Sequence, residues 1–388
     1  MKHTSILAVA ICILLSTSAN CLGNPMISRG TIPLAEEVTL TSIAGPLEYP
    51  WGIASLPDGS FLITQRSGQL RLISDGKLSP ESIEFPTEIL FLGQGGLLDV
   101  AVSPNFTQDQ MVYFSYATGN MDSNRLAIGR AKWNHGKLEN FEEIFKSAQS
   151  KNNGAHFGSR LAFLPDKTLL ATIGDGGNPP QEFLDIFARE QAQNLQTHFG
   201  SIIRINGDGS IPDDNPFNNQ ADALPQIWSF GHRNPQGLVI DYKSGEIWSS
   251  EHGPAGGDEL NLLKVGSNYG WPRVTFGRDY RDGSNISFKI TDPEFSSPVL
   301  AWLDTHAPGG LTLYTGNAFP EWQGRLLSAG LVSEDLRIIQ VKDGAAIGEL
   351  RIPVGERVRD AEVSQDGSLY ILTDGPKGRL LRVDPAKQ

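Results

Sequence analysis

One histidine and one aspartate stand at glycine-rich breaks beside consecutive predicted strands. His156 lies in N-G-A-H-F-G-S-R, just before the predicted strand 161–164, and Asp175 lies in G-D-G-G, which ends the next strand. Neighbouring strands of one sheet would place Asp175 beside His156, where a carboxylate orients the imidazole and raises its basicity. A lone histidine is more often a structural group, but this pairing predicts that His156 is a general base.

Gln94 lies in a glycine turn, G-Q-G-G, that precedes another predicted strand. Because glycine lets a ligand approach the backbone closely, we expect the side chain of Gln94 to be free to point at a ligand. Taken alone, the turn fits the ordinary start of a strand better.

Three arginines and an asparagine form two further motifs. Arg233 and Asn234 adjoin in G-H-R-N-P-Q-G, and Pro235 predicts a loop here because proline cannot continue an interior ladder. Arg357 and Arg359 share one face of a predicted strand, because side chains alternate with a period of two. A surface ion pair would explain a single arginine. Converging guanidinium groups instead predict a planar anion with more than one carboxylate or phosphate.

Oxygen donors concentrate between residues 251 and 272. The stretch E-H-G-P at 251–254 is followed by G-D-E-L-N at 257–261 and by N-Y-G-W-P at 268–272. His252 has no close second histidine or cysteine, which argues against zinc. Carboxylates and backbone carbonyls fit calcium better, although the spacing matches no EF-hand loop. The residues alone favour calcium without naming its ligands.

Composition narrows the class of protein. The 388 residues carry a formal net charge of -12 with a pI of about 5.1, and no basic stripe is visible, so nucleic acid is not an expected partner. Both cysteines, Cys12 and Cys21, lie near the N-terminus, which leaves the rest of the chain without a disulfide or a catalytic thiol. The 42 glycines and 24 prolines beside short apolar runs indicate many strands joined by turns.

Residues 1–23 have the pattern of a signal peptide. A positively charged start precedes an apolar stretch at 6–15, and small residues follow that permit cleavage after Ala19 or Gly23. The apolar stretch is short for a membrane span, so an uncleaved anchor is the less favoured alternative. Lipidation at Cys21 is another alternative, which the preceding residues fit poorly. We therefore expect an exported protein, periplasmic or secreted, that attaches to a membrane only if it is lipidated.

A loose repeat occupies residues 36–385. A turn with Pro, Asp or Gly leads into an apolar strand, a second turn and another strand, as in 57–64 followed by 69–73, and six copies recur at irregular spacing. Roughly 60 residues per copy is the size of a four-stranded blade with loops. We predict an all-β fold, a six-bladed β-propeller of four-stranded antiparallel blades, over a β-sandwich or two domains. The strand 38–41 should close the last blade as its outer strand, and the segment 181–192 should form a helical insertion.

The order of these motifs resembles the soluble PQQ-dependent aldose sugar dehydrogenases, a six-bladed propeller family of the soluble glucose dehydrogenase type. The resemblance spans roughly residues 45–385 and runs through G-Q-G-G-L-L-D-V, H-F-G-S-R, I-G-D-G-G, G-H-R-N-P-Q-G, E-H-G-P-x-G-G-D-E-L-N, N-Y-G-W-P and R-V-R-D. It implies an oxidoreductase that oxidises the C1 hydroxyl of an aldose to a lactone, with hydride transfer to pyrroloquinoline quinone (PQQ) activated by Ca²⁺. Its partners would be a small sugar and an electron acceptor that the sequence does not identify.

The resemblance also implies a role for each site residue. His156 would be the general base and Asp175 its orienting partner. Contacts to the quinone and its carboxylates would come from Gln94, Arg233, Asn234, Tyr280, Arg357 and Arg359. The catalytic Ca²⁺ would be held by the backbone carbonyls of Gly253 and Pro254, and a second, structural Ca²⁺ by Glu259 and the carbonyl of Tyr269. The segment 307–310 would line the cofactor pocket.

One position departs from the family pattern. Val332 stands where many relatives carry a lysine that touches the cofactor, which bears on cofactor affinity and redox tuning more than on the fold. Two other functions stay open. One is a calcium-dependent lactone hydrolase, which needs a central metal but no arginine cradle, so the three arginines argue against it. The other is a non-catalytic propeller that binds protein or glycan through its top face.

Overall fold

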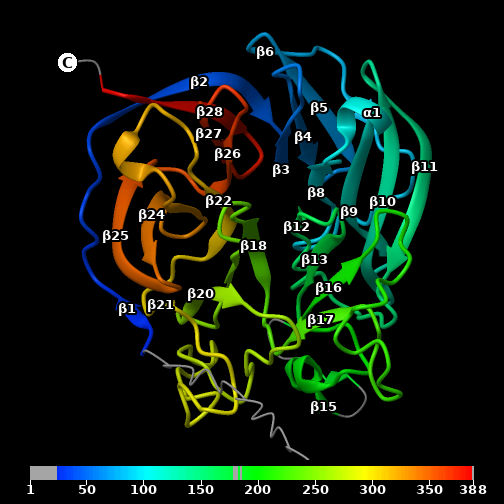
Figure 1. Ribbon diagram of the computed structural model, residues 1–388, viewed down its shortest axis with the longest axis vertical. Coiled ribbons are helices and arrows are strands. Elements are labelled where there is room, and N and C mark those ends of the chain that lie inside the picture. The colour runs from blue at the N-terminus through cyan, green and yellow to red at the C-terminus, as the bar shows by residue number, and fades with distance from the viewer. Residues whose placement is uncertain (1–23, 178–181, 184–185, 387–388) are drawn as a thin grey trace, which may run out of the picture.

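The computed structural model describes residues 24–177, 182–183 and 186–386, so the predicted signal peptide, with Cys21, lies outside the described residues. Six antiparallel sheets form a ring around a central axis (Figure 1). The described helices are short: α1 (Phe106–Asp109) and the 3₁₀ helices η1 (Ala188–Gln193) and η2 (Pro320–Trp322). None of them is long and apolar enough to cross a bilayer. The prediction of an all-β, six-bladed propeller is confirmed.

The blades are numbered along the chain, and each is given from its innermost strand outward. Blade 1 contains β3 (Pro50–Ser55), β4 (Phe61–Gln65), β5 (Gln69–Ser74) and two short strands that both pair with β5, β6 (Lys77–Leu78) and β7 (Ile83–Glu84). Blade 2 contains β8 (Leu97–Val102), β9 (Met111–Gly119), β10 (Asn124–Asn134) and β11 (Lys137–Lys146). Blade 3 contains β12 (Leu161–Phe163), β13 (Leu169–Ile173), β16 (Ser201–Ile205) and β17 (Ile227–Phe230).

The remaining blades complete the circle. Blade 4 contains β18 (Pro235–Ile240), β19 (Ile247–Glu251), β20 (Asp258–Leu263) and β21 (Leu300–Trp302). Blade 5 contains β22 (Pro308–Leu313), β23 (Leu326–Gly330), β24 (Asp335–Lys342) and β25 (Ala345–Pro353). Blade 6 contains β26 (Val358–Val363), β27 (Leu369–Thr373), β28 (Gly378–Pro385) and β2 (Val38–Leu47). The innermost strands contact one another in the order β3, β8, β12, β18, β22, β26 and back to β3.

The N-terminal segment closes this ring. β2 pairs antiparallel with β28, with Leu40 opposite Val383, so it is the outer strand of blade 6, as predicted. Ahead of it, β1 (Met26–Ser28) pairs in parallel with β21, which adds a fifth strand to blade 4 that the sequence analysis did not foresee. Between the two, Ala35 N donates to Arg351 O of β25 at 2.9 Å. The segment therefore runs along the outer edges of blades 4, 5 and 6 (Figure 1).

Apolar cores lie between neighbouring blades, and β13 shows why its sequence is apolar on both faces. Every residue of this strand is buried. Leu169, Ala171 and Ile173 pack in one core with residues of blade 2, whereas Leu170 packs in another with residues of blade 4. Because successive side chains point to opposite faces, a strand inside a blade contributes to two cores at once. The packed scaffold holds the loops at the strand ends in fixed positions.

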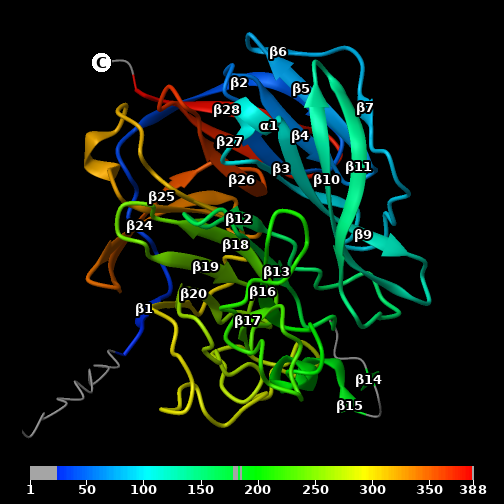
Figure 2. The same ribbon diagram turned by 45° about the vertical axis from the view of Figure 1, so that its right-hand side comes forward.

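The predicted helix at 181–192 is wrong for 182–183 and 186–187, and residues 188–192 are helical only as part of a 3₁₀ helix. In the described part of this segment, β14 (Glu182–Phe183) pairs with β15 (Ile186–Phe187) as a small hairpin, and η1 follows directly. The hairpin lies at the edge of the molecule (Figure 2). Ile186 and Phe187 are exposed, so an amphipathic helix here would have no apolar surface to pack on, and an isolated short helix is marginal in water.

The expectation that Pro235 lies in a loop is also wrong. Pro235 begins β18, the innermost strand of blade 4. An innermost strand is an edge strand with a ladder on one side only, so its first residue needs no N–H for pairing. The two residues before it, Arg233 and Asn234, remain in the turn that leads into this strand.

Candidate active site

His156 and Asp175 form a buried hydrogen-bonded pair in blade 3, where His156 lies in the loop before β12 and Asp175 follows β13. His156 Nδ1 lies 2.6 Å from Asp175 Oδ1, and the side chains are 2% and 0% exposed. Gly177 N donates to the same carboxylate oxygen at 3.0 Å, and Trp271 Nε1 donates to Asp175 Oδ2 at 2.8 Å. The predicted proximity of the two residues is confirmed. Because the carboxylate accepts at Nδ1, the neutral imidazole carries its proton there and Nε2 is left as an acceptor.

The surroundings keep His156 neutral and Asp175 anionic. Burial lowers the pKa of His156, Asp175 opposes this, and the positive charges of Arg233 and Lys151 lower the pKa further. Burial alone would raise the pKa of Asp175, but His156 and Arg233 outweigh it, so the pKa of this carboxyl is lowered. A neutral imidazole with a fixed tautomer beside a carboxylate is suited to accept a proton at Nε2.

The backbone around His156 is irregular. His156 has a φ of 47°, in the left-handed region that side-chain-bearing residues seldom adopt. Gly93 and Gly154 face each other so closely that a Cβ on either would overlap with the other loop. Gln94 N donates to Gly154 O at 2.5 Å, and His156 N donates to Gln94 Oε1 at 2.8 Å. The expectation that the Gln94 side chain is free is therefore wrong for its amide oxygen, which holds the loop that carries His156.

Arg233 reaches the pair from the turn before β18. Its Nη1 donates to the carbonyl oxygens of His252 and Gly253 at 2.9 and 3.0 Å. Its guanidinium group lies 5.4 Å from the ring centroid of Trp271 and 5.9 Å from that of Tyr280, which is exposed at the rim. The pocket beside these rings is lined by Gly177, Arg233, Pro254, Trp271 and Tyr280, among others. The structure thus brings two predicted cofactor residues, Arg233 and Tyr280, to a pocket that borders the His156–Asp175 pair.

Two buried donors at the site lack a partner. Asn234 Oδ1 accepts from Gly158 N at 3.0 Å, but Asn234 Nδ2 has no hydrogen-bond partner among the described residues. Arg359 Nε is likewise buried and unpaired within the described part of the chain. An unpaired buried donor is costly, and native proteins seldom keep one without a purpose. Both atoms suit a ligand that offers carbonyl or carboxylate oxygens.

Arg357 and Arg359 converge, but on a residue of the protein itself. Arg357 Nε and Arg359 Nη2 lie 3.3 and 3.0 Å from Asp374 Oδ2. Arg357 also donates from Nη1 to Leu331 O at 2.9 Å, so its guanidinium group lies beside the backbone that leads into the exposed Val332. Two guanidinium groups share one carboxylate, which leaves a net positive charge for an anion.

His252 lies close to both Arg233 and Arg359. Burial lowers the pKa of His252 to about 3, and the positive charges of Arg233 and Arg359 act in the same direction. These side chains are therefore close enough to interact electrostatically. Arg357 is connected to this set through Arg359, with which it shares Asp374.

The oxygen-rich segment contains a poorly paired, partly buried carboxylate, that of Glu259. Asn261 Nδ2 lies 3.4 Å from Glu259 Oε2, a long hydrogen bond. Burial, and after it the charge of Glu251, raises the pKa of Glu259 well above its ordinary value. Gly253 and Tyr269 line the same small pocket as Glu259. Within the described ranges no three His, Cys, Asp or Glu side chains form a metal-binding group, so a cation here would also need backbone carbonyls.

Three side chains at the site, Trp271, Asp374 and Lys151, were not predicted from the sequence to have a role. Trp271 was visible in N-Y-G-W-P, and its indole N–H fixes Asp175. Asp374 and Lys151 stand in no motif. Lys151 Nζ donates to Asn153 O at 2.8 Å and lies 3.4 Å from the ring centroid of Phe157. Only the fold reveals that these two charges lie near the site.

Comparison with known proteins agrees with the fold and the motifs. The family model described as Glucose / Sorbosone dehydrogenase matches residues 47–382. Aldose sugar dehydrogenase YliI of Escherichia coli (strain K12) is 35% identical over 90% of this chain and 93% of its own length. A crystal structure of the soluble aldose sugar dehydrogenase (Asd) from Escherichia coli is 34% identical, covers 90% of this chain and 100% of that one, and has a TM-score of 0.84. The PQQ-bound form of aldose sugar dehydrogenase (Adh) from Streptomyces coelicolor is 28% identical over 90% of this chain and 99% of that one, with a TM-score of 0.71. The chain belongs to the glucose/sorbosone dehydrogenase family.

Proposed function

We propose that this protein is a PQQ-dependent dehydrogenase that oxidises the C1 hydroxyl of aldose sugars to lactones, with Ca²⁺ at the cofactor. The observation that best supports this proposal is the buried His156–Asp175 pair beside the charge of Arg233 and the unpaired donor of Asn234. A hydrolase that acts through a metal, or a propeller that only binds, has no need for an oriented neutral base next to a cationic cradle. Relatives named aldose sugar dehydrogenase, one of them in a PQQ-bound form, support the same activity.

In this mechanism His156 accepts the C1 hydroxyl proton at Nε2, and Asp175 stabilises the imidazolium that forms. Gly177 N and Trp271 Nε1 fix the carboxylate, so the ring is oriented before the sugar binds. General-base assistance of this kind contributes roughly 10²–10⁴-fold to the rate. When bound, PQQ supplies the electron-accepting carbonyl group that takes up the hydride from C1.

The residues present fit a planar tricarboxylate such as PQQ. Arg233, Arg357 and Arg359 supply positive charge, of which Asp374 neutralises only part. Asn234 Nδ2 and Arg359 Nε supply buried donors that lack partners in the described structure. Tyr280 would close the pocket at its rim, whereas Gln94 would act through the loop of His156. Val332 contributes no charge, and Arg357 is the cation beside that position.

Calcium would take two places in this proposal. The carbonyl oxygens of Gly253 and Pro254 would hold one Ca²⁺ near the quinone, and Glu259 with the Tyr269 carbonyl would hold a structural one. Pro254 O accepts from Arg278 N at 2.8 Å and so keeps a second lone pair for a cation. Gly253 O accepts from Arg233 Nη1 at 3.0 Å and from Tyr280 Oη at 3.5 Å, and a cation there would replace the long Tyr280 contact. The poorly paired carboxylate of Glu259 is the observation that favours a hard cation at the second place.

We also propose that the protein works outside the cytoplasm, because residues 1–23 have the pattern of an export signal. The reduced cofactor would pass its electrons there to an acceptor partner.

The proposal is tested by titrating the purified protein with PQQ in the presence of Ca²⁺ or of a chelator, and following tryptophan fluorescence. We expect saturable, calcium-dependent binding, and reduction of an artificial electron acceptor by aldoses only when PQQ and Ca²⁺ are both present. Calcium-dependent opening of lactones without PQQ uptake would instead establish the hydrolase. Sugar binding with neither activity would establish a binding module.

The calcium site has its own test. Ca²⁺ should raise the melting temperature of the unsubstituted protein, because a ligand at 100 times its Kd stabilises the folded state by about 2.7 kcal/mol. Glu259→Gln should lose most of that rise, measured by thermal unfolding with and without a chelator. Glu81→Gln, at an exposed position, is the matched control and should keep the full rise. An equal rise in both variants would exclude Glu259 as a ligand.

A further inference from the structure

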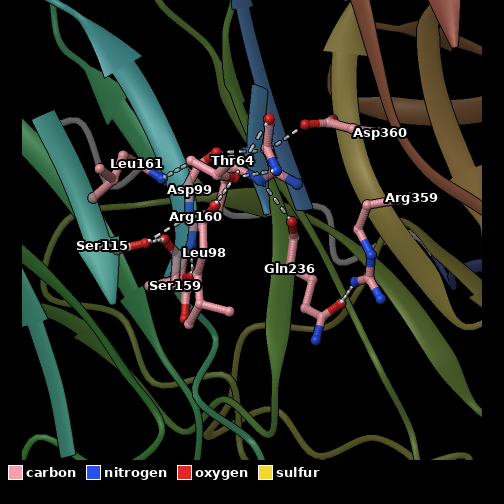
Figure 3. A network of polar contacts seen from close by, with 12 residues as sticks. Thr64, Leu98, Asp99, Ser115, Ser159, Arg160, Leu161, Gln236, Arg359 and Asp360 are labelled. Atoms are coloured by element: carbon pink, nitrogen blue, oxygen red, sulfur yellow. Dashed lines mark hydrogen bonds and ion pairs between the residues drawn. The ribbon is translucent and has the colours of Figure 1, made fainter. Parts of the chain in front are cut away.

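On the axis of the ring, one buried polar network joins blades 2, 3, 4 and 6 (Figure 3), and Trp51 of blade 1 and Gly310 of blade 5 pack against it. We call it the axial network. Its members are Asp99 in blade 2, Arg160 in blade 3, Gln236 in blade 4, and Arg359 and Asp360 in blade 6.

Arg160 is the centre of the axial network. Its Nη1 donates to Asp99 Oδ1 at 3.0 Å and to Asp360 Oδ2 at 2.7 Å, and its Nε donates to Gln236 O at 2.9 Å (Figure 3). Its guanidinium carbon lies 4.5 Å from the ring centroid of Trp51. Arg160 is only 6% exposed, so these charge-assisted bonds act in a low dielectric and fix the group firmly.

Blade 5 approaches this centre through a glycine. A Cβ at Gly310 would overlap with Asp360 Oδ1 and would lie 3.1 Å from Arg160 Nη2. The strand β22 therefore packs against the ion pair only because this residue has no side chain. The innermost strands thus form a ring around the axial network, and Asp99, Arg160 and Asp360 also line an open cavity along the axis.

Gln236 connects the axial network to the candidate cofactor pocket. Its backbone carbonyl is held by Arg160, and its side-chain Oε1 accepts from Arg359 Nη1 at 2.8 Å (Figure 3). Arg359 Nη2 is held by Asp374, which leaves Nε as the unpaired nitrogen. The guanidinium carbon of Arg359 also lies 5.7 Å from the Trp51 ring centroid. Two acceptors from different blades therefore determine which nitrogen of Arg359 is available to a ligand.

We propose that Gln236 is a positioning residue, which holds the Arg359 guanidinium group in the orientation that receives a carboxylate of the bound anion. The inference rests on the proposed function, because the anion is the tricarboxylate PQQ. Without Oε1 at this place, Asp374 alone would restrain Arg359 and the group could rotate. The affinity for the anion would then fall, although Gln236 acts only through Arg359.

A double-mutant cycle on the full chain tests this assignment. The Kd for PQQ is measured by fluorescence titration, in the presence of Ca²⁺, for the unsubstituted protein, Gln236→Met, Arg359→Met and the double variant. We expect Gln236→Met to raise the Kd about tenfold, the effect of one lost hydrogen bond to a charged group. In the Arg359→Met background the same change should alter the Kd by less than about twofold, because the group that Gln236 positions is gone.

Ser115→Ala is the matched control. Ser115 is fully buried, accepts from Asp99 N at 3.0 Å and donates to Ser159 O at 2.6 Å, but it lies on the side of the network away from Arg359. It should lower the melting temperature without changing the Kd for PQQ. Where Gln236→Met does not fold, Gln236→Asn withdraws the acceptor while keeping the amide and takes its place in the cycle.

The outcomes separate this inference from the proposed function. If the unsubstituted protein binds PQQ but Gln236→Met costs the same factor in both backgrounds, the positioning role is overturned and the proposed function stands. The same holds if Ser115→Ala weakens binding as much as Gln236→Met does. If the unsubstituted protein does not bind PQQ at all, the proposed function and the positioning role fall together.

Discussion

Blade 6, which closes the ring, and the mouth of the candidate site, formed by His156, Asp175, Lys151 and Asn234, are stabilised in different ways. In blade 6, Leu369 and Ile371 of β27 and Leu381 and Val383 of β28 point to one face of the blade, and all four pack in one apolar core with residues of blade 5. At the mouth the buried groups are polar or charged, and His156 adopts a positive φ. Buried donors there have no partner in the described structure, as at Asn234 Nδ2.

This difference separates two tasks that one ring must perform. Apolar burial stabilises blade 6 without directional demands, and its ladder to β2 closes the fold. The mouth keeps polar atoms buried and available for a ligand, which costs stability. The packing of the surrounding blades must offset that cost and hold the strained backbone in place. Substitutions in the apolar core of blade 6 should therefore change stability alone, and substitutions at the mouth should change activity with little effect on stability.

The largest expected effect is that of His156→Asn on activity. Asparagine tolerates the left-handed backbone found at this position, and its amide can donate to Asp175 as Nδ1 does. It cannot accept the substrate proton, so kcat for aldose oxidation should fall by about 10²–10⁴-fold. The rate of dye reduction with saturating PQQ, Ca²⁺ and sugar measures the loss.

PQQ binding and thermal unfolding are the controls for this variant. Both should stay close to those of the unsubstituted protein, because the cradle and the blade cores are untouched. Full activity in His156→Asn would show that His156 is not the general base, and that a substitution at the mouth need not change activity.

The second effect is that of Leu369→Ala on stability. Leu369 is fully buried in β27, and Asp374 lies beyond the opposite end of that strand. Truncation of a buried leucine lowers the free energy of unfolding by about 2–5 kcal/mol, which urea denaturation measures. Because the residue touches no group of the site, kcat per folded molecule should not change. Leu369→Met, which conserves volume, should cost less than about 1.5 kcal/mol. A parallel fall in kcat for Leu369→Ala would show that the closing blade and the mouth are coupled.

Much of blade 6 and of the other cores could be predicted from the sequence, because burial alone decides those residues. The apolar run at 169–173 and the lone strand at 38–41 have only one place in a closed ring. The pairing of His156 with Asp175 was also predictable, since both stand at breaks beside adjacent strands.

Other features depend on contacts through space, and the sequence carries no signal for them. Asp374 meets Arg357 and Arg359 only because β27 ends beside the start of β26. Gln94 turns its amide oxygen to a backbone N–H of another blade, which no local pattern specifies. The hairpin near 182–187 was mistaken for a helix, because three apolar residues at helical spacing do not tell whether a core lies beneath them.

The smallest expected effect is that of Lys151→Met, which should shift the pH dependence of catalysis. Lys151 is 8% exposed, and burial lowers its pKa to about 7, with Asp175 opposing. The pKa of His156 lies below its ordinary value, so the lysine still carries its charge when the histidine titrates. Burial is the main cause of the lowered pKa of His156; Asp175 raises this pKa, and Arg233 and Lys151 lower it. Removal of the lysine charge should therefore raise the pKa of His156. Because only neutral His156 accepts the proton, the acid limb of the kcat/KM profile should move to higher pH.

Lys146→Met is the matched control, because it removes the same charge from an exposed side chain that pairs with Glu143. Solvent and salt screen that charge, so the acid limb should stay where it is. A purely structural lysine would lower activity evenly across the profile, since Lys151 Nζ also binds Asn124 Oδ1 at 3.1 Å and Asn153 O at 2.8 Å. An unshifted limb in Lys151→Met would therefore assign Lys151 to the scaffold of the loop. A shifted limb would show that the mouth tunes its base with a buried charge, which no residue of the apolar blade core could do.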